Sequence, residues 1–187
     1  MVVWVSPVDR GGSGRASRGP RRWDVAPGAE AVGACQWLMA WGLLVAAHPA
    51  PGAGALVVFG VGSVAAVAAG FLHGLLLVKP LAVLGRLTAR LTAWPEPVAA
   101  LVLTVPVSAP PALLAHAWLS GHVASAPGPG AVWAGTAASA LLPLAAGGYL
   151  RARPVPLRAL WTRGLAVTAA VAVALVTTAE IVLTPTA

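Results

Sequence analysis

Histidine and carboxylate side chains are the groups in this sequence with the chemistry to hold a metal ion. His48, His116 and His122 lie at or beside the ends of apolar runs, and Glu180 is the one carboxylate inside such a run. Imidazole combined with carboxylate suits zinc, copper, nickel or iron. One hypothesis is therefore a divalent metal site built from His116, Glu180 and either His48 or His122.

The same residues have a second interpretation. Polar side chains collect at membrane interfaces, and Glu180 lies about four residues, roughly 6 Å, inside the end of its run, close enough to reach the surface. His116 and Glu180 could instead carry a proton or form a hydrogen bond between two helices. On one continuous helix His116 and His122 point to nearly opposite sides, so His122 joins a metal site only if Gly121 ends that helix.

No other pattern in the sequence indicates catalysis, and no further cofactor is expected. Motifs for a nucleophile elbow, a phosphate loop, a zinc protease and a dinucleotide-binding turn are absent. The single Cys35 excludes an intrachain disulfide and a cysteine-based cluster. His73, in the stretch "GFLHG", is offset in depth from His116 by roughly 16 Å, so the two cannot share a haem iron. We expect a neutral His73 bonded to a neighbouring helix.

The composition of the chain predicts the kind of secondary structure that carries these residues. Of 187 residues 58% are hydrophobic and only 9% are charged, against about 25% charged residues in an ordinary soluble domain. Mean hydropathy is +0.83. A soluble fold could not cover its surface with so few polar side chains, so the bilayer is the expected solvent. The predicted class is an all-α integral membrane protein.

Five apolar runs are long enough to span a membrane as helices. We predict a transmembrane domain over residues 31–187, preceded by a disordered, basic cytoplasmic tail over residues 1–30. A downstream start codon, or a signal peptide cleaved after Ala47 or Ala55, would remove part of this N-terminal region. The predicted spans are approximately 31–47, 53–78, 98–120, 131–150 and 164–183.

Two segments within this domain depart from a plain spanning helix. Residues 79–94 place leucines and a tryptophan on one side and arginines on the other, which predicts a short amphipathic helix in the headgroup layer. A short solvated connector is the alternative, because Pro80, Gly85 and Pro95 weaken a helix. The third span carries Pro106, Pro110 and Pro111, so we expect a kinked or broken helix there.

Basic residues set the expected orientation. Arg and Lys number five before the first span, three between the second and third, four between the fourth and fifth, and none in the other connections or after the last span. Positively charged short loops stay cytoplasmic, which predicts a cytoplasmic N-terminus and an extracytoplasmic C-terminus. The excess of Arg over Lys is typical of a GC-rich bacterial genome, hence an inner membrane. Anionic lipid headgroups, not nucleic acid, are the expected counter-charge.

Small residues at four-residue spacing predict close helix packing, either inside the chain or in a homo-oligomer. They form stripes on the second, fourth and fifth spans: Gly62, Ala66, Gly70 and Gly74; Ala131, Gly135 and Ser139; and Ala166, Ala170, Ala174 and Thr178.

These features favour a non-enzymatic accessory or scaffold subunit of a bacterial membrane complex, with a membrane protein or a second copy as partner. A small transporter or permease component is the main alternative, because proline-broken helices can line a site. A metal-dependent membrane enzyme is the third.

Overall fold

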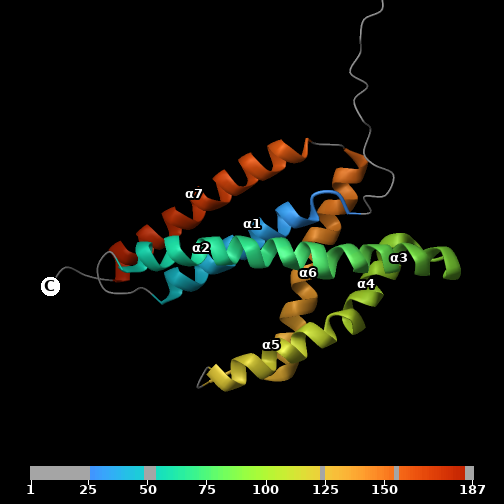
Figure 1. Ribbon diagram of the computed structural model, residues 1–187, viewed down its shortest axis with the longest axis horizontal. Helices are drawn as coiled ribbons and strands as arrows, with labels where there is room; N and C mark the ends of the chain where they lie inside the picture. Colours follow the sequence, from blue (N-terminus) through green and yellow to red (C-terminus); the bar gives the residue numbers. More distant parts are fainter. Residues whose placement is uncertain (1–25, 49–53, 123–124, 154–155, 184–187) are drawn as a thin grey trace, which may run out of the picture.

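The computed structural model describes residues 26–48, 54–122, 125–153 and 156–183, and every regular element in that part of the chain is a helix (Figure 1). Five helical stretches are long and apolar enough to cross a membrane, which confirms the predicted all-helical class. Residues 1–25 of the predicted tail lie outside the described residues. The helices are α1 (Ala29–Ala47), α2 (Gly54–His73), η1 (Gly74–Val78), α3 (Lys79–Thr92), α4 (Glu96–Val107), α5 (Ala109–His122), α6 (Pro129–Ala152) and α7 (Leu157–Leu183).

The second span is longer than predicted, because α2, η1 and α3 form one continuous helical stretch from Gly54 to Thr92. Pro80 does not break it. The turn before Pro80 is π-helical, and the Lys79 N–H bonds to the Gly74 carbonyl, five residues back. A π-turn absorbs the missing donor of a proline without ending the helix. The amphipathic segment is therefore helical, but it is a continuation of α2 and not a separate helix.

The third span is broken, as its prolines predicted. It divides into α4 and α5 at Ser108. The Ser108 hydroxyl donates to the Val105 carbonyl at 3.0 Å, and Trp133 of α6 donates its indole N–H to the same carbonyl at 2.9 Å. Because unpaired backbone groups are costly in lipid, these two side chains stabilise the break.

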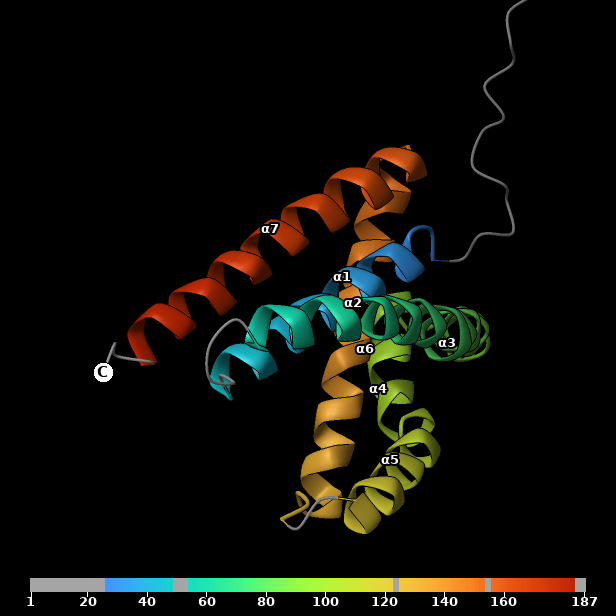
Figure 2. The same ribbon diagram turned by 60° about the vertical axis from the view of Figure 1, so that its left-hand side comes forward.

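Two groups of helices meet at one end of the molecule and diverge from there (Figures 1 and 2). The first arm consists of α1, α2 and α7, which contact one another, and the second arm consists of α4, α5 and α6. The start of α1 crosses α6 where the arms meet, and α3 packs on α4. One buried apolar cluster, which includes Ala29, Val78, Leu81 and Ala140, lies at this meeting point. A second, which includes Leu38, Phe59 and Val176, lies inside the first arm.

Glycines bring α1 and α2 into backbone contact. A Cβ placed on Gly70 would collide with the Gly33 carbonyl, and one placed on Gly74 would lie 2.7 Å from the Ala29 carbonyl oxygen. The small-residue stripe of the second span therefore packs within the chain. On α7 the predicted stripe behaves differently: Ala166, Ala170, Ala174 and Thr178 are exposed, and Ala172 and Val176 make the buried contacts instead.

Candidate functional site

The four predicted metal ligands lie on three different helices. His48 caps the end of α1 and His122 is the last residue of α5, and both are exposed. Their Nδ1 atoms lie 3.1 Å from the Leu44 carbonyl and 2.8 Å from the Trp118 carbonyl, respectively. His116 in α5 and Glu180 in α7 are half-buried.

The structure does not bring these four residues together. His116 and His122 lie on the second arm, whereas His48 and Glu180 lie at the far end of the first arm (Figure 1). Among the described residues, no group of three or more His, Cys, Asp and Glu side chains is placed to hold a metal ion. Gly121 does not end α5, which continues to His122. The geometry therefore gives the metal hypothesis no support.

His73 lies at the crossing of the arms and contacts a neighbouring helix, as predicted. Its Nε2 lies 3.4 Å from the Ser139 hydroxyl of α6, and its ring faces Trp37 of α1 with centroids 6.0 Å apart. The Ser139 hydroxyl also donates to the Thr136 carbonyl of its own helix at 2.8 Å. Pro143, four residues after Ser139, lacks the N–H that would bond the Ser139 carbonyl. His73 thus links α2 to α6 where the α6 backbone has a donor missing.

An ionic cluster at the meeting point of the arms was not foreseen. Glu96, at the start of α4, pairs with Arg151 at the end of α6 and with Arg86 of α3, at 2.7 and 3.6 Å from one carboxylate oxygen. Glu30 of α1 pairs with Lys79 at the start of α3. The signal was available in the sequence, since each acid lies in a segment predicted to be on the same side of the membrane as its basic partner.

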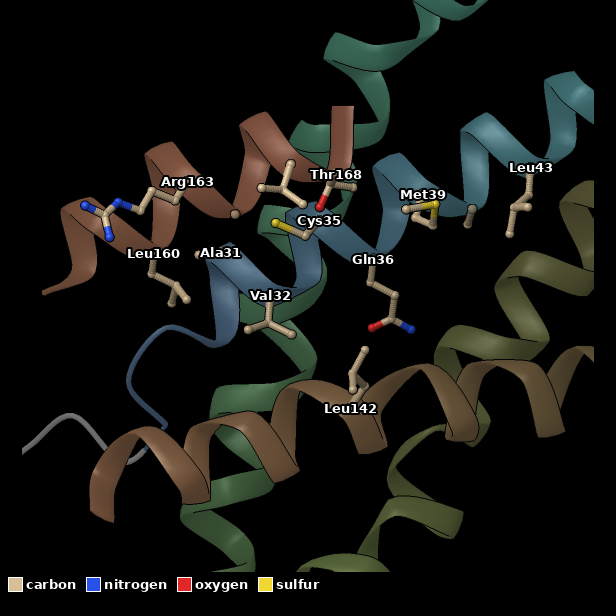
Figure 3. A pocket seen from close by; sticks show the side chains of 13 residues that line it. Ala31, Val32, Cys35, Gln36, Met39, Leu43, Leu142, Leu160, Arg163 and Thr168 are labelled. Carbon is tan, nitrogen blue, oxygen red and sulfur yellow. The ribbon is translucent and has the colours of Figure 1, made fainter. Parts of the chain in front are cut away.

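A cavity of about 780 Å³ lies between α1, α6 and α7 (Figure 3). Its wall is mostly aliphatic, with Val32 and Leu43 from α1, Leu142 from α6 and Val167 from α7. Arg163 lies at one end, beside the start of α1, and Leu43 lies toward the other end. This α1/α6/α7 groove has the size of a small-molecule site, for which about 300–1,000 Å³ is typical.

The polar contacts between helices and the α1/α6/α7 groove have different roles. His73, Ser108, Trp133 and the ionic cluster connect helices to one another. The groove presents an apolar surface with one cation at its end, which suits the binding of an apolar ligand more than catalysis. The chain matches no protein-family model, no curated protein and no solved structure.

Proposed function

We propose that this chain is a multi-pass bacterial inner-membrane protein that serves as an accessory or scaffold subunit of a membrane complex. The observation that carries the proposal is the outer side of α7. Its exposed stripe of small residues, Ala166, Ala170, Ala174 and Thr178, runs along about three turns of the helix. Helices associate in lipid through surfaces that allow close backbone approach, so this stripe suits a partner helix.

The orientation belongs to the same proposal. One ion pair joins the start of α1 to the start of α3, and two others join the start of α4 to α3 and to the end of α6. All of these segments adjoin stretches rich in arginine. Such a basic end is expected on the cytoplasmic side, facing anionic headgroups. The exposed Leu84, Leu87 and Leu91 of α3 support a position of that helix in the headgroup layer.

A transporter remains the second candidate, favoured by the break between α4 and α5 with buried Thr104 and Ser108. Both hydroxyls, however, bond to carbonyls of their own helical segment, of Ala100 and Val105. Because each hydroxyl has one proton and donates it to the local backbone, neither can donate to a solute, which makes the subunit role the better supported one. Solute flux in proteoliposomes that Ser108→Ala abolishes would reverse this preference.

The test of the subunit role is purification in a mild detergent followed by native mass spectrometry. We expect a defined hetero- or homo-oligomer, which Ala170→Leu dissociates because the larger side chain separates the helices. Leu175→Phe, at an exposed residue of α7 about 140° around the helix from Ala170, is the matched control and should leave the assembly intact. A monomeric mass for the wild-type chain, at all detergent concentrations tried, would contradict the proposal.

A further inference from the structure

The α1/α6/α7 groove has the dimensions of a site for a single lipid chain. Along α1 it runs from Ala31 to Leu43, twelve residues or roughly 18 Å at 1.5 Å per residue. One leaflet of a bilayer core is about 15 Å deep. The groove therefore extends from the basic end of the protein to about the depth of one leaflet.

The groove is charged at one end and apolar farther along, as a phospholipid is from its phosphate to its acyl chains. Arg163 lies at the end where α1 begins (Figure 3), and it forms no ion pair with a carboxylate among the described residues. A cation of this kind suits a phosphate, which accepts charge-assisted hydrogen bonds from the guanidinium. Farther along α1, Met39 and Leu43 present apolar surface to a hydrocarbon chain.

Between these two zones lies a polar group whose hydrogen-bonding capacity is not used. The Gln36 side chain points from α1 toward α6, near Leu142 (Figure 3). Its Oε1 is buried and has no hydrogen-bond partner among the described residues. Buried amide oxygens are nearly always bonded, so this amide has hydrogen-bonding capacity left for a ligand or water. Gln36 is five residues beyond Ala31, roughly 8 Å along the helix, where a lipid with its phosphate at Arg163 has its glycerol group.

We propose that the α1/α6/α7 groove binds one anionic phospholipid of the cytoplasmic leaflet. Its phosphate lies at Arg163, its glycerol region bonds Gln36, and one acyl chain lies along α1 toward Leu43. The choice of leaflet rests on the orientation given under Proposed function, but the binding itself depends on neither that orientation nor a partner protein.

Cys35 makes the proposal testable without engineering, because it is the chain's single cysteine and lines the groove. We expect N-ethylmaleimide to label Cys35 in detergent-purified, full-length protein. Added phosphatidylglycerol should slow this labelling at least fivefold, and phosphatidylcholine should do so much less. Cys35→Ala gives the background.

Native mass spectrometry supplies the second readout. The wild-type protein should retain one phosphatidylglycerol. Arg163→Gln should weaken retention about fivefold, the effect of one basic side chain on an anionic lipid. Arg158→Gln removes the same charge from the same helix, at a residue outside the groove, and should change retention less than twofold. Ala40→Phe should fill the groove and abolish retention without altering a buried position.

Three outcomes would overturn the lipid site. These are equal retention by Arg163→Gln and Arg158→Gln, labelling of Cys35 that phosphatidylglycerol does not affect, and protection of Cys35 by a partner protein but not by lipid. Failure of the subunit role is separable, since a monomer that still retains one phosphatidylglycerol contradicts only the partner. An oligomer that retains no lipid contradicts only the groove.

Discussion

Arg151 and Glu96, fifty-five residues apart in the chain, form an ion pair of 2.7 Å that joins the end of α6 to the start of α4. Arg86 of α3 approaches the same carboxylate oxygen. One acidic side chain thus connects three helices, α3, α4 and α6. Both Glu96 and Arg151 are more than one-third exposed, so the energetic effect of their pair should be modest and sensitive to salt.

A double-mutant cycle on Glu96→Gln and Arg151→Gln should therefore give a coupling free energy of about 0.5–1 kcal/mol at low salt. The coupling should decrease toward zero at molar salt, because screening acts strongly on exposed charges. Unfolding of the detergent-purified protein in SDS, followed by circular dichroism, measures it. Strictly additive effects at low salt would mean that the pair does not connect the helices.

The contact between α1 and α2 is expected to tolerate no side chain at Gly70. Gly70→Ala would place a Cβ against the Gly33 backbone, and overpacking of this kind costs about 1–3 kcal/mol. Gly60→Ala on the same helix is the control. A Cβ at Gly60 meets nothing within 4 Å, so that variant should be neutral or more stable, since alanine favours the helix. Equal SDS-unfolding midpoints for the two variants would contradict the close crossing.

The break between α4 and α5 should depend on Trp133. Its indole N–H lies 2.9 Å from the Val105 carbonyl and 3.0 Å from the Ser108 hydroxyl. Trp133→Phe keeps the ring but removes the donor, and we expect a loss of about 1 kcal/mol in the free energy of unfolding. Trp118→Phe, at an exposed tryptophan of α5, should change it by less than half as much. Equal losses in Trp133→Phe and Trp118→Phe would show that the effect is not specific to the hydrogen bond at the break.

The proposed orientation predicts which loops are accessible from each side. In a Cys35→Ala background, Thr92→Cys should react with a membrane-impermeant maleimide only in inverted vesicles. Gly128→Cys should react in intact cells, because its connection contains no basic residue. Both positions are exposed, so burial does not explain a lack of labelling. The reverse pattern would invert the topology and move the groove to the outer leaflet.

Much of the architecture follows from the sequence because a membrane imposes local requirements. A span needs about 20 apolar residues whose backbone bonds are satisfied within the segment, and prolines remove donors at known positions. The five spans and the break near Pro106 could therefore be predicted. The continuation of the second span through Pro80 could not, because it depends on a π-turn in which Lys79 bonds to Gly74.

The lateral positions of the candidate site residues could not be predicted from local sequence features. The expected depth of His116 and Glu180 follows from the sequence, since depth is a count of residues along each helix. That the two lie on different arms is visible only in the folded chain, because lateral position depends on which helix faces pack together. For the same reason the Gly33 and Gly70 contact, the Glu96 ion pairs and the groove beside Arg163 emerge only when the helices are assembled.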